Sequence, residues 1–327
     1  MISALVYRDD GASAYEETAL DAARDADGTT WVRATTGEEF DRVAEAFGIH
    51  SLSVEDVRND ARPKTEEYDE YTFVLVRMAT LRAGEQVFEE EVQTRPVGLC
   101  FGDDWLVTLT RRELEPINYV WNAIEREEPR MLRFGPDYVG YRVIDRIVDE
   151  YFGLLDEVGG EIELIEDSIF EGPDPEVLEG LNAVRRDLLS FRKTVWPTRE
   201  AVGVLARGDP DYVREATEKY YRDVYDHLVE LVDLTETYRD LARGARDIYL
   251  NTLSQSTNEV MKTLTVVATI ILPLTLVVGI YGMNFDSGAS VFNMPELGWA
   301  YGYPATMLGM ALVSVVLLVY FRREHWL

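Results

Sequence analysis

Two long apolar segments near the C-terminal end dominate the hydrophobic pattern of the chain. Residues 260–281 hold one charged side chain, Lys262, and residues 303–321 hold none. As helices, both segments are long enough to cross about 30 Å of hydrocarbon. Aromatic residues flank the pair at both ends, as is typical of membrane–water interfaces. They are Tyr281, Trp299, Tyr301 and Tyr303 at one end, and Tyr320 and Trp326 at the other.

The basic residues beside these segments predict their orientation. The loop of residues 282–302 has no Lys or Arg, whereas Lys262, Arg322 and Arg323 lie at the opposite end of the hairpin. Because positive residues favour the cytoplasmic side, we expect a multi-pass protein of the cell membrane with both termini in the cytoplasm. The start of the chain lacks the features of a signal peptide.

Upstream of the apolar segments the pattern is helical. Breaks that contain Gly and Pro at 135–136, 172–175 and 208–210 bracket two helices of about 35 residues each. No proline lies between Pro210 and Pro273, so a third helix over that gap can run roughly 90 Å. Apolar residues recur along it at spacings of four and three, which predicts a packing seam against other helices. The seam residues are Val224, Leu228, Leu231, Thr235, Tyr238, Ala242 and Ala245.

Residues 1–134 alternate short strand-like and helix-like patterns. β-branched and aromatic residues concentrate at 30–33, 71–76 and 105–109, as strands require. Residues 37–47 and 53–58 have the pattern of short helices, and Ser53-x-x-Asp56 resembles a helix cap. The segment shows no phosphate loop and no nucleophile elbow.

These patterns predict a chain built from six parts. An N-terminal α/β cytoplasmic domain is followed by long cytoplasmic helices and a stalk helix that continues into the first transmembrane helix. A loop on the outer side then leads to a second transmembrane helix and a basic tail. The expected boundaries are 1–134, 135–209, 210–281, 282–302, 303–321 and 322–327.

The charge of the chain is concentrated in its first part. There are 60 acidic and 32 basic side chains, a net charge of −28, and all but three of the acidic residues lie in the first 263 positions. That body is rich in Leu, Val and Tyr, so we expect a folded domain with a solvated, halophile-like acidic surface. Such a negative field argues against nucleic acid as a partner. The single cysteine, Cys100, excludes an intrachain disulfide and a cysteine metal site.

Polar and small residues share one face of the first apolar segment. They recur at spacings of three and four, while bulky β-branched residues point elsewhere. Such a face suits either helix packing in an oligomer or a wetted ion path, and periodicity alone favours neither. The second segment has no comparable line, so we expect it to face lipid. The face consists of Asn258, Met261, Thr265, Ala268, Leu272, Thr275 and Gly279.

A short motif follows at the outer end of the first segment. Gly282-Met283-Asn284 ends the segment, and Met294-Pro295-Glu296-Leu297 lies in the loop after it. The chain resembles the CorA magnesium transport family, whose signature is Gly-Met-Asn at this position. The resemblance extends to residues 258–262, 221–227 and 54–64, and so covers nearly the whole chain.

The resemblance implies a funnel-shaped homopentamer whose long helices line a pore. Gly282, Met283 and Asn284 would form the selectivity filter, where a ring of Asn284 amides can hydrogen-bond a hydrated Mg²⁺ without stripping its waters. Glu296 would lie in the outer loop. The implied pore-lining residues are Asn258, Met261, Leu264, Thr265, Ala268, Leu272, Thr275 and Gly279. The apolar constriction of the pore would be formed by Met261 and Leu272. Either Leu264 or Thr265 would contribute beside Met261.

The resemblance also implies regulatory Mg²⁺ sites between neighbouring cytoplasmic domains. Asp223 matches the position of a regulatory carboxylate, and Asp247 is a candidate for a second site nearer the membrane. Glu89, Glu90 and Glu91 are candidate partners from the N-terminal domain.

Basic residues near the membrane and the histidines complete the candidate sites. Lys262, Arg322 and Arg323 would form a positive collar, which Glu324 interrupts. The three histidines of the chain are too scattered along it to suggest a zinc cluster. His227 is therefore expected to be packed or hydrogen-bonded on its helix rather than to act as a metal ligand.

The predicted function is passive influx of hydrated Mg²⁺, with Co²⁺ or Ni²⁺ as further ions, driven by the membrane potential and gated by cytoplasmic Mg²⁺. The expected partners are copies of the same chain, the lipid bilayer and divalent cations, with no organic cofactor and no enzymatic activity. A zinc transporter of the same fold is an alternative, although relatives of that kind tend to replace the residue at Met283. A membrane-tethered cation sensor without flux is another, and would not need a continuous polar face.

Overall fold

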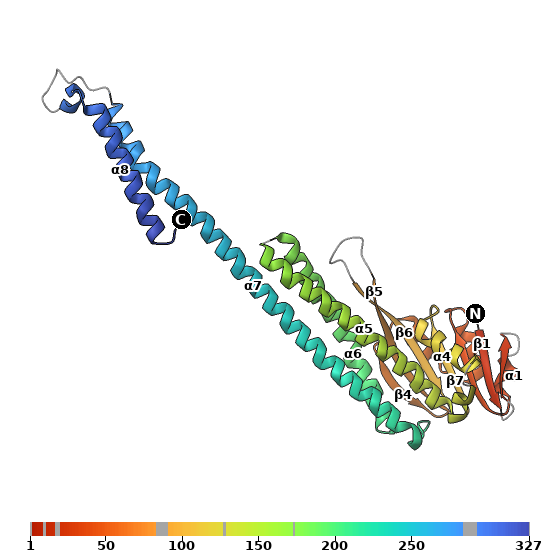
Figure 1. Ribbon diagram of the computed structural model, residues 1–327. Helices are drawn as coiled ribbons and strands as arrows, with labels where there is room; N and C mark the ends of the chain where they lie inside the picture. The colour runs from red at the N-terminus through yellow and green to blue at the C-terminus, as the bar shows by residue number, and fades with distance from the viewer. Residues whose placement is uncertain are drawn as a thin grey trace. The chain divides into compact units, whose positions relative to one another are not determined.

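The computed structural model describes residues 2–8, 11–16, 20–82, 91–126, 129–172, 174–283 and 293–326. The chain divides into two compact units, Met1–Asp247 and Ile248–Leu327. Helix α7 (Glu215–Tyr281) contributes residues to both units. Figure 1 labels the elements along the chain.

A seven-stranded sheet lies at the centre of the first unit, counted over the described residues, in the order β2-β1-β3-β7-β6-β5-β4. Neighbouring strands are antiparallel except β3 and β7, which are parallel. The strands predicted at 30–33, 71–76 and 105–109 are confirmed as β3, β5 and β7. The bounds are β1 (Ile2–Arg8), β2 (Gly11–Glu16), β3 (Thr29–Ala34), β4 (Lys64–Tyr68), β5 (Tyr71–Arg82), β6 (Glu91–Phe101) and β7 (Trp105–Thr110).

Three short helices cover one face of this sheet, namely α1 (Leu20–Arg24), α2 (Phe40–Phe47) and α3 (Ser51–Arg58). Their apolar side chains form one buried cluster with strand residues such as Phe73 and its cross-strand neighbour Cys100. Alternation along the strands sends every second side chain to this face. The predicted short helices at 37–47 and 53–58 are thereby confirmed, although their first residues differ.

The prediction that Ser53 begins the second short helix is wrong. The N-cap of α3 is His50, whose Nδ1 accepts a hydrogen bond from the backbone N–H of Leu52 at 3.1 Å. Ser53 is buried inside the helix, and its hydroxyl lies 3.0 Å from the hydroxyl of Tyr71. A tertiary partner therefore satisfies the side chain that the local pattern assigned to a cap.

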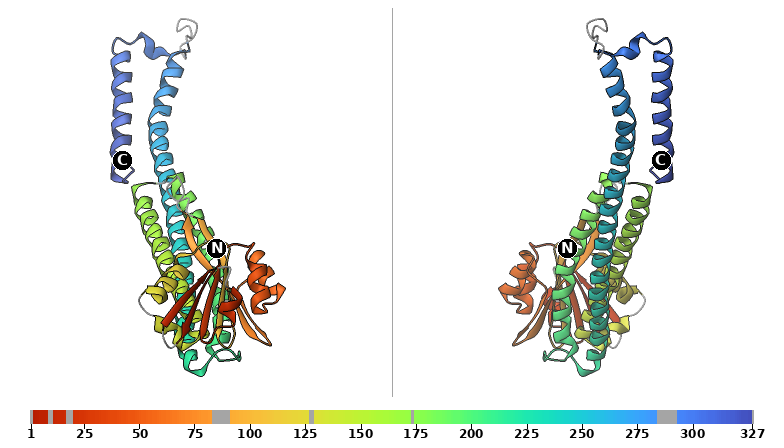
Figure 2. Two further views of the ribbon diagram at one scale, coloured as in Figure 1. Left: turned by 90° about the vertical axis from the view of Figure 1, so that its right-hand side faces the viewer. Right: turned by 90° about the vertical axis from the view of Figure 1, so that its left-hand side faces the viewer.

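The long helices α5 (Pro136–Glu171) and α6 (Pro175–Ala206) pack on the other face of the sheet, together with α4 (Glu115–Arg126) and the 3₁₀ helix η2 (Pro129–Phe134) (Figure 2). α5 has 36 residues and α6 has 32, which confirms the two predicted helices of about 35. Each begins with a proline, and Asp174 caps α6 by accepting a hydrogen bond from the N–H of Glu176. Both features end the preceding segment and start a helix at a defined residue.

Helix α7 is 67 residues long and packs against α5 and α6 in the first unit. Six of the seven predicted seam residues are buried, and Tyr238 is half-buried against Gly159 of α5. The packing seam that the heptad-like spacing predicted is therefore confirmed. Because the seam follows one side of the helix, the opposite side carries exposed charges such as Asp223 and Asp226.

Asp137 joins the start of α5 to the start of α7 and is fully buried. Its Oδ2 accepts a hydrogen bond from the backbone N–H of Arg214 at 3.0 Å, and the guanidinium of Arg214 lies 3.7 Å from Oδ1. The backbone carbonyl of Asp137 accepts a hydrogen bond from Tyr221 at 2.8 Å. At Gly135, φ is 96° and a Cβ would lie 1.6 Å from the guanidinium of Arg214, so only glycine fits there. These contacts fix the base of the long helix.

The second unit contains the end of α7, the 3₁₀ helix η3 (Pro295–Gly298) and α8 (Gly302–Arg323). α7 and α8 are long and apolar enough to cross a membrane, and they contain the two predicted spans. They run side by side (Figures 1 and 2). Near the C-terminal end of α8, Phe321 is buried and stacks on Trp326 with ring centroids 5.8 Å apart.

Asp137→Ala should lower the stability of the first unit by about 1–3 kcal/mol, because it leaves the N–H of Arg214 without its acceptor inside the fold. Asp137→Asn keeps an oxygen acceptor at the same place and should cost less. Thermal unfolding of the full chain, followed by circular dichroism, measures both. Equal midpoints for the wild type and Asp137→Ala would show that this contact does not hold the two helices together.

Candidate ion pathway and metal centre

The side of α7 that contacts α8 is defined by four residues. Lys262 donates a hydrogen bond from Nζ to the backbone carbonyl of His325, and Val266 is only 3% exposed. Val277 and Tyr281 line a pocket shared with α8. At about 100° per residue these four positions lie on one side of the helix. The polar and small residues predicted to line a pore lie on the opposite side.

The predicted pore face is exposed in the single chain. Met261, Leu264 and Leu272 are 56%, 61% and 66% exposed. The remaining residues of this face are exposed too, except that Ala268 is half-buried; they are Asn258, Thr265, Thr275 and Gly279. Within the described part of the second unit, α8 covers the other side of α7 only. This face is therefore available to other subunits or to an ion path.

Two threonine hydroxyls on this face donate their protons to the helix itself. Thr265 Oγ1 donates to the carbonyl of Met261 at 2.7 Å, and Thr275 Oγ1 donates to the carbonyl of Ile271 at 3.0 Å. A hydroxyl whose proton is engaged in this way still offers oxygen lone pairs. The two side chains therefore present acceptors, which suit the water protons around a hydrated cation.

The signature motif begins where α7 ends. The N–H of Gly282 donates to the carbonyl of Val278 at 2.9 Å, and the N–H of Met283 donates to the carbonyl of Ile280 at 3.2 Å. The side chain of Met283 is 53% exposed. Asn284 lies outside the described residues. In the loop, the backbone of Glu296 belongs to η3, while its side chain lies outside the description.

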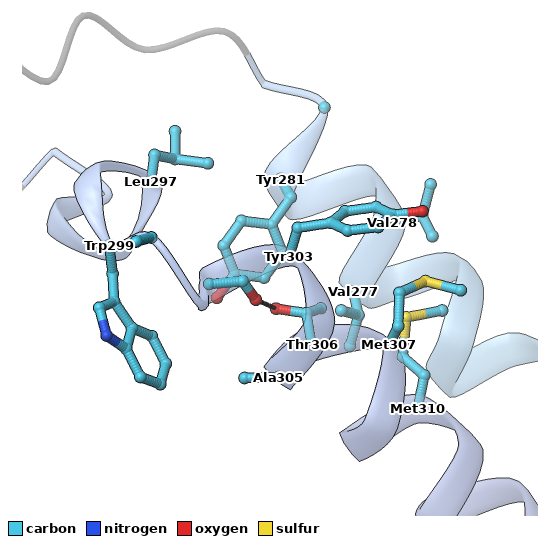
Figure 3. A pocket seen from close by; sticks show the side chains of 13 residues that line it. Val277, Val278, Tyr281, Leu297, Trp299, Tyr303, Ala305, Thr306, Met307 and Met310 are labelled. Atoms are coloured by element: carbon cyan, nitrogen blue, oxygen red, sulfur yellow. Dashed lines mark hydrogen bonds between the residues drawn. The ribbon is translucent and has the colours of Figure 1, made fainter.

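A pocket of about 740 Å³ lies between the C-terminal end of α7 and the start of α8 (Figure 3). Its wall is mostly apolar and includes Tyr281, Trp299, Tyr303, Met307 and Met310. Tyr281, Trp299 and Tyr303 are three of the four aromatic residues predicted to mark one membrane interface. The pocket therefore lies at the end of the hairpin that carries the signature motif.

The basic collar residues lie together at the other end of the hairpin. Arg322 and Arg323 form the last turn of α8 and are exposed. Lys262 of α7 reaches the backbone of His325 just beyond them. The structure thus places Lys262 at the same end of the hairpin as Arg322, 60 positions later in the chain. The carbonyl of His325 takes up part of the hydrogen-bonding capacity of Lys262.

The predicted regulatory acids on α7 are far apart along the helix. Asp223 and Asp247 are both exposed, and a helix rises roughly 36 Å over the residues between them. One chain cannot bring both to the same ion. Glu89 and Glu90 lie outside the described residues, and Glu91 begins β6 opposite Arg82, with its side chain outside the description.

Two carboxylates of α5 and one imidazole of α7 form a cluster that could hold a metal ion. Ligand atoms of Asp145, Asp149 and His227 all lie within 4.8 Å of one another. His227 packs edge-on against Phe152, with ring centroids 5.9 Å apart, which agrees with its predicted packing. However, its buried Nδ1 has no hydrogen-bond partner among the described residues. The imidazole therefore retains a free ligand atom.

The electrostatics of this cluster connect it to Asp223. Burial raises the pKa of Asp145 above its ordinary value, and the negative charges of Asp149 and Asp223 raise it further. Arg142, which lies 3.4 Å from Asp145, and His227 act in the opposite direction. Because the ionised form of Asp145 is disfavoured overall, a bound cation would stabilise it.

Sequence reasoning identified Asp223 in this region but missed Asp145 and Asp149. A signal was present, since the two acids are spaced i, i+4 among the buried residues Val143, Ile144, Ile147 and Val148. Asp223 and His227 have the same spacing on α7. The packing of α5 against α7 decides that the acidic pair of α5 lies beside His227 of α7. No local pattern in the sequence contains that information.

Comparison with known proteins identifies the family. The model of the family described as "CorA-like Mg2+ transporter protein" matches residues 26–323. The chain is 37% identical over 308 residues to the cobalt/magnesium transport protein CorA of Thermotoga maritima, covering 93% of this chain and 85% of that one. It is 33% identical over 281 residues to the putative metal ion transporter YfjQ of Bacillus subtilis, covering 86% and 83%. This chain belongs to the CorA-like Mg²⁺ transporter family.

A solved CorA structure has the same fold. The complete structure of the CorA magnesium transporter from Methanocaldococcus jannaschii superposes with a TM-score of 0.83 at 22% identity, and covers 100% of this chain and 99% of that one. The predicted class, an α/β domain followed by a long helix and two apolar C-terminal helices, is thereby confirmed as the CorA fold. The family is one of membrane transporters, in agreement with the absence of a catalytic motif in the sequence.

The donor set of the cluster of Asp145, Asp149 and His227 suits divalent cations. Carboxylate oxygens are preferred by Mg²⁺, which keeps several of its waters when it binds to protein. An added imidazole favours Co²⁺, Ni²⁺ or Zn²⁺ over Mg²⁺. The residues that could hold such an ion in this CorA-family chain are Asp145, Asp149 and His227, with Asp223 close enough to influence the charge.

Asp145→Asn should raise the midpoint of thermal unfolding in metal-free buffer at pH 7, because the ionised carboxylate is disfavoured in the folded chain. This loss of folding stability is absent below the ordinary aspartate pKa of about 4. It grows as the pH rises from there to the raised folded-state pKa, and is fully present above it. The gain should therefore be larger at pH 7 than at pH 4. The same variant should bind Co²⁺ at least about tenfold more weakly.

Asp156→Asn is the matched control, because Asp156 lies exposed on the same helix. The substitution removes the same charge as Asp145→Asn. It should change neither the midpoint nor the Co²⁺ affinity. An Asp145→Asn variant that binds Co²⁺ as tightly as the wild type would remove Asp145 from the metal centre.

Proposed function

We propose that this chain is one subunit of a homopentameric Mg²⁺ channel in the cell membrane, in which the face of α7 opposite α8 lines the pore. The line of polar and small residues on that face carries the proposal, because α8 contacts the other side of α7 and leaves this line open. The line leads to the Gly282-Met283-Asn284 motif. Two helices per chain cannot enclose a path by themselves, so several copies are needed.

The proposed cargo is hydrated Mg²⁺. Mg²⁺ releases its inner waters reluctantly, and a ring of Asn284 amides would bind those waters without replacing them. Thr265 and Thr275 would offer further oxygen acceptors below the ring. The relative from Thermotoga maritima is named a cobalt/magnesium transport protein, and Co²⁺ and Ni²⁺ would be carried as hydrated divalent ions in the same way.

The proposed driving force is the membrane potential. Both termini would lie in the cytoplasm and the loop of residues 282–302 outside, because the basic collar residues belong on the cytoplasmic side. A divalent cation that enters down an inside-negative potential gains about 4.6 kcal/mol per 100 mV. Met261 and Leu272 would form the apolar constriction, which empties of water when the pore closes.

The proposed gate responds to cytoplasmic Mg²⁺. Asp223 would bind the ion between subunits, with a partner carboxylate from Glu89, Glu90 or Glu91 of the adjacent chain, and Asp247 would serve a second site. Asp145 and Asp149 lie near Asp223 in the same chain, so a bound cation would offset repulsion among several carboxylates. Loss of the ion would restore that repulsion and favour a different arrangement of the subunits.

A zinc transporter of the same fold and a cation sensor without flux remain the competing functions. Met283, which precedes Asn284 in the signature, favours Mg²⁺ over the zinc alternative. The exposed polar face of α7 favours transport over sensing, since a sensor has no need of it. Both alternatives are distinguished by measuring Mg²⁺ and Zn²⁺ entry into the same vesicles.

Asn284→Ala should reduce Mg²⁺ influx into liposomes that contain the purified protein by more than about tenfold, because it removes the amide ring that holds the hydrated ion. Influx is followed with a Mg²⁺-sensitive dye under an inside-negative potential. Asn293→Ala is the control, since it makes the same change in the same loop outside the signature. Wild-type influx in Asn284→Ala would contradict the filter, and Zn²⁺ entry without Mg²⁺ entry would support the zinc transporter.

Asp223→Lys should raise the internal Mg²⁺ concentration at which influx stops, because it replaces a ligand with a repelling charge. The measurement compares influx into liposomes loaded with graded Mg²⁺. Asp226→Lys, an equal charge change on an exposed residue one helical turn further along α7, should leave the threshold unchanged. If Asp223→Lys keeps the wild-type threshold, Asp223 is not part of the sensor, although transport itself would stand.

A further inference from the structure

A basic hollow of about 410 Å³ lies at the end of strand β7, in the first unit. Its volume falls within the usual range for small-molecule sites. Among the described side chains, none of the candidate ion-pathway or metal residues lines it. Its lining consists of Gln93, Arg95, Pro96, Arg111, Arg112 and Leu114.

The hollow forms because β6 is longer than its neighbour β7. Residues 97–101 of β6 pair with β7, whose last paired residue is Thr110, so residues 91–96 extend past the end of that strand. Pro96 suits the point where the ladder ends, because proline has no N–H to donate. The chain then turns through Arg111 and Arg112 towards α4. The turn places two arginines beside the uncovered part of β6.

One of these arginines is held in place by a shared carboxylate. Arg111 lies 2.5 Å from Oδ2 of Asp60, and Arg77 lies 3.2 Å from Oδ1 of the same residue. Arg77 also donates a hydrogen bond to the backbone carbonyl of Asp60 at 3.1 Å. A single carboxylate is thus shared between two guanidinium groups, and their combined charge remains positive.

The other two arginines have no such partner. Among the described residues, neither Arg95 nor Arg112 forms an ion pair or a side-chain hydrogen bond, although Arg95 is half-buried. Like charges gathered at one place repel one another. The arrangement is the more unusual because the chain as a whole carries a net charge of −28.

We propose that this hollow binds a phosphate-bearing small anion. Guanidinium groups match phosphate oxygens with paired hydrogen bonds, and three arginines line this hollow together with Gln93. The hollow is larger than a single phosphate ion needs, which favours a diphosphate or a phosphorylated small molecule. The described lining residues include no aromatic ring for a nucleobase to stack on, so the phosphate itself would carry the recognition. The site is independent of the transport function.

Pyrophosphate is the probe that tests the site. The full chain in nanodiscs of phosphatidylcholine, in buffer without divalent cations, is titrated with pyrophosphate in a calorimeter. Wild type should bind one pyrophosphate per chain. Arg95→Gln with Arg112→Gln should bind at least about tenfold more weakly, the loss expected when charged hydrogen-bond donors are removed. These two arginines are chosen because neither forms an ion pair with any residue that the structure describes.

Two further variants separate recognition from general charge. Arg126→Gln with Arg133→Gln removes the same charge from exposed residues outside the hollow and should change the affinity by less than about twofold. Arg95→Lys keeps the charge but loses the paired donors, so its affinity should lie between the wild type and the double variant. Unchanged unfolding midpoints would exclude misfolding as the cause.

The outcomes are distinct. Weak binding by the double variant alone supports the site. No pyrophosphate binding by the wild type, or equal losses in the double variant and the Arg126→Gln with Arg133→Gln control, would overturn it. A second titration in nanodiscs that contain phosphatidylglycerol identifies the source of the phosphate. Unchanged affinity there indicates a soluble ligand, and competition indicates a lipid headgroup.

Discussion

The continuity of α7 is the constraint on which the rest of the structure depends. A segment that crosses hydrocarbon must satisfy every backbone N–H and C=O internally, which a helix does. In this chain the same run of hydrogen bonds extends from the membrane segment back to Glu215, over 67 residues. Along the seam from Val224 to Ala245 the helix packs against α5 and α6, and the contacts of Asp137 fix where the helix begins.

Helix α7 carries candidate functional residues in both units of the chain. Different sides of α7 have different neighbours. One side packs against α5 and α6, another contacts α8, and the predicted pore face remains exposed. His227, at the interface of α7 with α5, adds a ligand atom to a carboxylate pair whose negative charge is costly without a cation. A metal ion bound there would contact α5 and α7 together, and would offset the repulsion that raises the pKa of Asp145.

Much of the fold could be predicted from local pattern, because burial forces a periodic pattern on helices and strands. The strands β3, β5 and β7, the two long helices and the seam of α7 were all visible as spacings. The prediction failed at Ser53, where a cap-like pattern was overruled by a buried contact with Tyr71. It also failed to assign Asp145 and Asp149 to a metal centre. Both failures concern side chains whose partners lie far away in the sequence.

The sequence by itself determined the membrane segments, the long helix and the family, because each depends on the length of a pattern or on a short motif. Only the tertiary structure decided which side of α7 meets α8, which acids of α5 face His227, and how Arg95 comes to lie beside Arg111 and Arg112. The physical reason is the same in each case. A pattern specifies which face of an element is apolar, whereas its neighbour depends on the packing of the whole chain.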